Sequence, residues 1–127
     1  MSKKIELKHD NIIRDKSFAF AVRIVNLYKF LTGEKKEYVL SKQLLRSGTS
    51  IGANVEESAG GQSEKDFLSK LSIAYKEARE TCYWLKLLYA TGYLSENQYT
   101  SLIADADELC KILGKIQTTM KKKMKNS

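Results

Sequence analysis

The chain of 127 residues contains no proline, a single histidine and two cysteines. Sandwiches, barrels and other turn-rich folds place prolines at their turns and edges, so the absence of proline favours long helices. No uncharged run approaches the roughly 18 residues that a membrane-spanning helix requires. The first residues include lysines but no apolar stretch of the kind found in a secretory signal. We therefore expect a cytoplasmic protein with no membrane partner.

The residues that could support hydrolysis are badly placed for it. Residues 48–52 read GTSIG and match the G-x-S-x-G nucleophile elbow of α/β-hydrolases, which requires a preceding strand and a histidine base. This run lies within a helical pattern, and the single histidine, His9, stands near the start of the chain. We therefore expect that Ser50 is not a nucleophile.

Metal and cofactor sites lack a ligand set as well. Glu77 and Glu80 have the three-residue spacing of a di-iron bundle, but no histidine of the helical segments joins them. Cys82 and Cys110 have no partners nearby in sequence that could complete a zinc site. Each lies in an apolar helical pattern, which is typical of a reduced core cysteine. We expect no cofactor, no bound metal and no enzymatic activity.

Apolar residues recur in alternating steps of three and four along most of the chain, as they do in helices packed into a bundle. The clearest stripe is Phe67, Leu71, Ala74, Ala78, Thr81, Leu85 and Leu88. Short loops between such helices make sequence neighbours antiparallel. The fold class predicted is therefore all-α, an antiparallel up-down-up-down four-helix bundle. Its helices are expected near residues 15–32, 37–58, 64–91 and 95–120.

Capping residues mark the ends of the last two predicted helices. Ser63 stands three residues before Asp66, which is the spacing of a helix-capping pair. Ser95 and Gln98 share that spacing and form a capping box in sequence. Gly92 precedes them and suits the end of a helix.

Apolar surface exceeds what a narrow bundle seam would bury. The first segment has two apolar edges, namely Phe18, Ala21, Val25 and Tyr28, and Phe20, Ile24, Leu27 and Leu31. Large aromatic side chains also lie outside the narrowest stripes: Phe20, Tyr75, Tyr83, Trp84 and Tyr89. Several such groups in a small bundle indicate a second buried surface, so we expect a homo-oligomer.

The net charge of +7 is concentrated at the two ends of the chain. Residues 1–9 are expected to form a flexible basic N-terminus, residues 10–120 the bundle, and residues 121–127 a flexible lysine-rich tail. Two interpretations of the ends stay open, namely solvation of the termini or attraction to nucleic-acid phosphates. The candidate nucleic-acid contacts are Arg23, Lys29, Lys42, Lys121, Lys122 and Lys123.

A weaker charge asymmetry exists inside the predicted domain. Residues 9–50 carry a net positive charge and residues 51–118 a net negative charge. A domain with a basic and an acidic face can pair head to tail with copies of itself, or bind an acidic partner on one face.

Small residues gather in the second segment, at Ser47, Gly48, Ser50, Gly52 and Ala53. Gly48 and Gly52 are four residues apart and so share one helix face, where another backbone can approach closely. A glycine inside a helix costs up to about 1 kcal/mol relative to alanine. We therefore predict a compensating contact, a close helix crossing, at these two glycines.

Residues 44–57, LLRSGTSIGANVEE, resemble the signature of the bacterial four-helix-bundle proteins called S23 or 23S rRNA intervening-sequence proteins. Residues 77–85, EARETCYWL, are similar to the third-helix pattern of that family. The resemblance covers about residues 15–116. Gly52 stands where many members have proline and Ser58 where many have glycine, which indicates a subgroup.

The resemblance implies a bundle that assembles into a ring-like homo-oligomer, a pentamer. The matched family positions are Arg46, Ser47, Ser50, Asn54, Glu57 and Glu80. We interpret them as interaction residues, with Ser50 and Asn54 hydrogen bonding across a tight helix contact. Arg46 is expected to pair with glutamates, either within a subunit or between subunits.

The sequence thus favours a non-enzymatic, self-assembling scaffold or adaptor, with nucleic acid as a candidate ligand. The alternative rests on related branches of the family. One branch comprises accessory proteins of retroelements that bind nucleic acid and a reverse transcriptase, and other members are encoded within insertions in 23S rRNA genes. The alternative function is therefore a nucleic-acid-binding accessory protein of a reverse transcriptase or of an rRNA intervening-sequence element.

Overall fold

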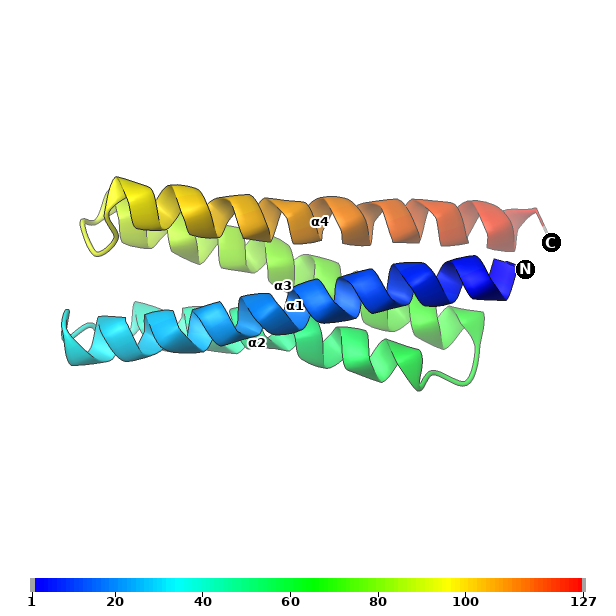
Figure 1. Cartoon of the computed structure of the whole chain (residues 1–127), viewed down its shortest axis with the longest axis horizontal. Helices are drawn as coiled ribbons and strands as arrows, with labels where there is room; N and C mark the ends of the chain where they lie inside the picture. The colour runs from blue at the N-terminus through cyan, green and yellow to red at the C-terminus, as the bar shows by residue number, and fades with distance from the viewer. Residues whose placement is uncertain (1, 127) are drawn as a thin grey trace.

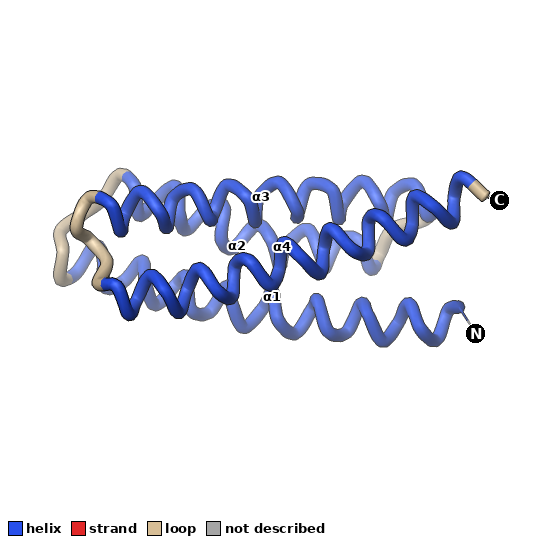
Figure 2. The backbone as a smooth tube through the Cα atoms, turned by 90° about the horizontal axis from the view of Figure 1, so that it is seen from above, coloured by secondary structure: helices blue, strands red, loops and turns tan. Residues whose placement is uncertain are grey.

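The computed structural model describes the backbone of residues 2–126 and the side chains of residues 12–126. Its helices are α1 (Ser2–Gly33), α2 (Leu40–Ala59), α3 (Glu64–Ala90) and α4 (Glu96–Lys125). Successive helices run antiparallel and pack against each other, and α4 also contacts α1 (Figure 1, Figure 2). Residues 2–126 contain no strand. The predicted up-down-up-down four-helix bundle is confirmed.

Helices α1 and α4 are longer than the sequence pattern predicted. Helix α1 begins at Ser2 instead of near residue 15, and α4 continues to Lys125. Neither added stretch contains proline or glycine, so nothing in the local sequence stops the helix there. Ile13 is buried, which shows that the core extends beyond the predicted start of the first helix.

Of the two ends predicted to be flexible, residues 1–9 and 121–127, residues 2–9 belong to α1 and residues 121–125 to α4. Their flexibility stays a prediction. Residues 1 and 127 lie outside the described residues, as do the side chains of residues 2–11.

Both predicted caps are present. The side chain of Ser63 accepts a hydrogen bond from the backbone N–H of Asp66 at 3.1 Å. Ser95 and Gln98 form a reciprocal capping box, with bonds of 2.8 and 3.1 Å. Gly92 follows α3 with a φ of 86°, in the left-handed region that favours glycine. These local predictions are confirmed.

Helix α2 begins with a cap that the sequence pattern did not indicate. The buried carboxylate of Glu37 accepts hydrogen bonds from three successive backbone N–H groups. The donors are Val39, Leu40 and Ser41, at 3.1, 3.0 and 2.7 Å. Burial opposes ionisation, but these N–H groups outweigh it and hold the pKa of Glu37 below its usual value. The helix therefore starts at Leu40, about one turn after the predicted start.

Helix α1 buries only one of its two apolar edges. The buried edge is Phe20, Ile24, Leu27 and Leu31, and it joins the bundle core. On the other edge, Phe18 and Val25 are exposed. The wide apolar face predicted for this helix is therefore half core and half surface.

The aromatic residues predicted to lie outside the bundle core are also partly core and partly surface residues. Phe20 is a core residue, and Tyr75 and Trp84 are partly buried against the core. Tyr83 and Tyr89 are exposed among the large hydrophobic side chains. Only part of the predicted surplus is therefore available to a partner.

Helices α1 and α2 cross closely at the two glycines of α2. A Cβ atom at Gly48 would lie 2.8 Å from Cγ1 of Ile24 and 2.9 Å from its Cγ2. A Cβ atom at Gly52 would lie 3.3 Å from the carbonyl oxygen of Ser17. Both positions therefore have less room than a side chain needs, and the predicted close crossing is confirmed.

We predict that Gly48→Ala lowers the free energy of unfolding by about 1–3 kcal/mol, the usual cost of overpacking a core. The helix propensity of alanine would by itself give an opposite effect of about 1 kcal/mol. The matched control is Gly114→Ala, whose Cβ would meet only Cε1 of Tyr75 at 3.6 Å. We expect that control to stabilise the protein in urea unfolding followed by circular dichroism.

A second background isolates the steric cause. In Ile24→Ala, which removes the side-chain atoms nearest Gly48, the penalty of Gly48→Ala should become smaller. If Gly48→Ala stabilises the protein as much as Gly114→Ala does, the close crossing is not a packing constraint.

Candidate functional site

A polar cluster joins α2 to α3 around Arg46. One guanidinium nitrogen of Arg46, Nη1, lies 3.2 Å from Oε2 of Glu77, and the other, Nη2, pairs with Oε2 of Glu80. The same Glu80 oxygen accepts a hydrogen bond from the indole Nε1 of Trp84 at 2.9 Å. Arg46 therefore pairs with two glutamates of its own chain, which confirms the ion pairs predicted for it within a subunit.

Beneath this cluster, a buried hydroxyl pair links the same two helices. Thr81 Oγ1 donates to Ser47 Oγ at 2.9 Å, and both residues are inaccessible to solvent. Burying two hydroxyls is tolerated because each has a hydrogen-bond partner. Ser47 thus has a structural contact, one that fixes α3 against α2.

The hydrogen bonds predicted for Ser50 and Asn54 across a helix contact are wrong. Ser50 Oγ donates to the carbonyl oxygen of Arg46 at 2.6 Å, within α2. Asn54 Nδ2 donates to the carbonyl oxygen of Ser50 at 2.8 Å, again within α2. Short polar side chains reach the carbonyl four residues earlier more easily than they reach another helix. Ser50 also lies in the interior of a helix, where no nucleophile elbow forms.

Glu57 lies outside the Arg46 cluster. It stands about three helical turns beyond Arg46 on α2. Its carboxylate lies 3.4 Å from Nζ of Lys70 on α3, and both side chains are largely exposed. The structure thus brings Arg46, Ser47 and Glu80 together and leaves Glu57 in a separate ion pair.

Sequence reasoning missed two members of the cluster, Thr81 and Trp84. Glu77 and Thr81 are four residues apart, as are Glu80 and Trp84, so each pair shares a helix face. That spacing was the available signal.

The candidate nucleic-acid contacts do not form one patch. Arg23 Nη1 lies 2.6 Å from Oδ2 of Asp105 on α4, so its charge is paired. Lys29 and Lys42 are exposed near the loop between α1 and α2, whereas residues 121–123 lie at the opposite end of the bundle (Figure 1). Lys123 also pairs with Glu64 at 3.5 Å.

Many of the opposite charges that make the two halves of the chain asymmetric pair with each other within one chain. Basic residues of α1 and α2 reach carboxylates of the acidic half, at distances of 3.1, 3.3 and 2.6 Å for the α1 pairs. These pairs are Arg14–Glu56, Lys16–Glu108 and Arg23–Asp105, and Arg46 adds Glu77 and Glu80. The asymmetry is therefore weaker support for head-to-tail pairing than the sequence suggested.

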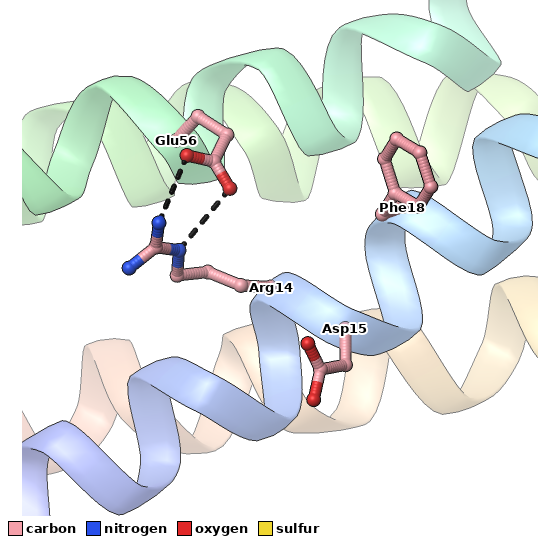
Figure 3. A pocket seen from close by; sticks show the side chains of 4 residues that line it. All are labelled: Arg14, Asp15, Phe18 and Glu56. Carbon is pink, nitrogen blue, oxygen red and sulfur yellow. Dashed lines mark hydrogen bonds and ion pairs between the residues drawn. The ribbon is translucent and has the colours of Figure 1, made fainter.

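A surface hollow of about 480 Å³ lies between α1 and α2 (Figure 3). Its lining consists of Arg14, Asp15, Phe18 and Glu56. Nε and Nη2 of Arg14 donate to the two carboxylate oxygens of Glu56, each at 3.1 Å, and Asp15 points away from this pair. The hollow presents an exposed aromatic ring beside a satisfied ion pair, which suits contact with a partner better than chemistry.

Within the part of the chain that the structure describes, no group of three or more histidine, cysteine, aspartate or glutamate side chains is arranged to hold a metal ion. None of the helices in that part has an apolar stretch long enough to cross a bilayer.

The family model described as "23S rRNA-intervening sequence protein" matches residues 9–115. The chain belongs to this family. A solved structure from Bacteroides thetaiotaomicron, described as a protein of unknown function from the S23 ribosomal protein family, is 57% identical. It superimposes with a TM-score of 0.85 and covers 87% of this chain and 98% of its own. No curated protein matches the chain. The family predicted from residues 44–57 and 77–85 is confirmed.

For this family member, we predict that Arg46→Glu lowers the free energy of unfolding by about 1–2 kcal/mol, because it replaces two ion pairs with repulsion. Urea unfolding followed by the fluorescence of Trp84, the single tryptophan, measures the change. Lys86→Glu, an equal charge reversal at an exposed site on α3, is the control and should have little effect.

Restoring the pair tests its location. The exchange Arg46→Glu with Glu80→Arg should recover part of the lost stability, because it restores the pair between positions 46 and 80 but leaves Glu77 facing a carboxylate. A fall in assembled mass with unchanged subunit stability would instead mean that Arg46 acts between subunits.

Proposed function

We propose that the chain is a non-enzymatic helical-bundle protein that assembles with copies of itself into a pentameric ring and serves as a scaffold or adaptor. The observation that carries this proposal is an exposed apolar stripe on α1. The stripe consists of Phe18, Val22 and Val25, whose exposed fractions are 71%, 46% and 36%. These residues follow one another in steps of four and three, so they share one outward face of the helix. We call them the α1 stripe.

A second apolar patch lies on the outer face of α3. Ile73 and Tyr83 are 40% and 58% exposed, lie about 80° apart around the axis of α3 and about 15 Å apart along it, and we call them the α3 patch. Helices α1 and α3 each contact α2 and α4 and are diagonal in the bundle. The α1 stripe and the α3 patch therefore lie on opposite sides of the molecule.

Two different apolar patches on opposite sides favour a head-to-tail contact between copies. In such a contact the α1 stripe of one copy covers the α3 patch of the next, and the series closes into a ring or continues as a filament. Burying a phenylalanine side chain contributes about 1.5–3 kcal/mol, enough to make Phe18 a principal contact. The choice of a closed ring with five copies rests on the family resemblance.

The alternative function, a nucleic-acid-binding accessory protein, is favoured by one further observation. The first turns of α1 and the last turns of α4 lie at the same end of the bundle (Figure 1). This brings the backbone positions of Lys3, Lys4 and Lys8 to the end where residues 121–125 supply four more lysines. We call this the basic end. Positive charge gathered in this way attracts nucleic-acid phosphates.

We predict that light scattering gives a mass of five times 14.5 kDa. Phe18→Gln should weaken the assembly by about tenfold or more, because it removes about 1.5–3 kcal/mol of burial. Val39→Gln is the matched control, since Val39 is also 71% exposed but lies on neither patch. Tyr83→Gln should act like Phe18→Gln, and circular dichroism should show that the helices are retained.

Other masses would contradict this proposal in distinct ways. A monomer at micromolar concentration excludes self-assembly as the function. A stable dimer excludes the pentamer. Equal effects of Phe18→Gln and Val39→Gln would exclude the α1 stripe as the contact.

For the alternative, we predict that changing all three lysines of 121–123 to glutamine weakens binding to a single-stranded RNA or DNA oligonucleotide. The slope of log affinity against log salt should fall by about 0.7 for each lost phosphate contact. The control changes Lys29, Lys35 and Lys42, near the opposite end of the bundle, to glutamine and should leave the slope unchanged. Absence of binding by the unmodified chain at low salt would exclude this function.

A further inference from the structure

The two cysteines of the chain meet between α3 and α4. Cys82 on α3 and Cys110 on α4 are free thiols, each partly exposed to solvent. Cys82 Sγ reaches Asp107, which stands three residues before Cys110 on the helix packed against α3, so the two thiols lie near each other across the contact between α3 and α4. The apolar pattern around each cysteine predicts a role in core packing, and nothing in their spacing indicates that they meet. The α1 stripe, the α3 patch and the basic end do not use either thiol.

Charged groups from both helices surround this pair. Cys82 Sγ lies 3.7 Å from Oδ1 of Asp107, which stands about one turn before Cys110 on α4. Arg79 stands about one turn before Cys82 on α3, and its Nη1 donates to the hydroxyl of Tyr75 at 3.3 Å. The guanidinium also lies 5.9 Å from the centre of the Tyr75 ring. Tyr75 thereby keeps Arg79 on the side of α3 that carries the thiols.

This environment makes the two thiols unequal. The hydrogen bond from Cys82 lowers the pKa of Cys110, and the charge of Arg79 lowers it further, against burial and the charge of Asp107. The same thiol–thiol hydrogen bond, together with burial, raises the pKa of Cys82. Cys82 Sγ donates to the carboxylate of Asp107, a contact that favours the thiol form of Cys82, so we assign the reactive thiolate to Cys110.

We propose that Cys82 and Cys110 form an oxidation site for hydroperoxides, at which the two thiols become an intramolecular disulfide that links α3 to α4. The juxtaposition of two partly exposed thiols on facing helices carries the inference. It goes beyond the proposed assembly function and does not depend on it.

The reaction balances in two steps. The Cys110 thiolate attacks one oxygen of hydrogen peroxide, the O–O bond breaks, and the leaving hydroxide takes a proton to give water and a sulfenic acid on Cys110. The Cys82 sulfur then attacks the Cys110 sulfur, the S–O bond breaks, and a second water leaves with the thiol proton. Two thiols lose two electrons and two protons, and one peroxide becomes two waters.

The test treats the full-length protein with hydrogen peroxide and measures its intact mass and free thiols. The expected result is the loss of two hydrogen atoms, the loss of both titratable thiols, and a peptide that joins Cys82 to Cys110. Dithiothreitol should reverse all three changes. The oxidised protein should also unfold at a higher temperature, because the disulfide restricts the unfolded chain.

Variants separate the roles of the two sulfurs. In Cys82→Ser, oxidation should stop at a sulfenic acid on Cys110, which dimedone traps as an adduct. In Cys110→Ser, Cys82 should react severalfold more slowly. Arg79→Gln should slow disulfide formation, whereas Lys76→Gln, which removes an equal charge on the same helix, should not.

Three outcomes would overturn the proposal. The first is that both thiols survive an excess of peroxide while the helices stay intact by circular dichroism. The second is that the disulfide forms between copies instead of within one chain. The third is that Cys82 alone carries the sulfenic acid, which would reverse the assigned roles and remove the basis of the mechanism.

Discussion

Helices α1 and α2 approach so closely at Gly48 and Gly52 that even a β-carbon at Gly48 would collide with Ile24. This contact fixes how α1 is rotated about its own axis, because Ile24 must lie over one glycine and the Ser17 backbone over the other. Once α1 is rotated in this way, its second apolar edge is turned toward solvent, and Phe18 becomes a surface residue. A core contact of α2 therefore determines which surface α1 offers to a partner.

The ion pairs align neighbouring helices along their length more than they add to the stability of the fold. Antiparallel packing sets the basic α1 beside α4 and Arg46 of α2 beside the glutamates of α3, so most pairs link helices that already touch. Each exposed pair stabilises the fold by about 0–1 kcal/mol at most, much less than the burial of a core leucine. Their charges nevertheless cancel along the middle of the bundle. The unbalanced charge is left at the basic end, where the lysines of both chain ends gather.

The features that could be predicted from the sequence are those that depend on residues close together in the chain. Apolar periodicity and the caps at Ser63 and Ser95 predicted the helices, and the glycine spacing predicted the crossing. Contacts set by tertiary packing could not be predicted in this way. The exposure of Phe18 depends on the rotation of α1, and the meeting of Cys82 with Cys110 depends on the register of α3 against α4. Ser50 was assigned a partner on another helix, but the nearest carbonyl of its own helix is a closer acceptor.

The positions of the α1 stripe and the α3 patch limit the kinds of assembly that would cover them. A two-fold dimer uses one patch twice, so a dimer through the α1 stripe would leave Ile73 and Tyr83 in water on the far side of each subunit. A head-to-tail contact covers one patch of each kind at every interface. An open series still exposes one patch at each of its ends and keeps growing. A closed ring is the head-to-tail assembly in which no copy leaves either patch uncovered.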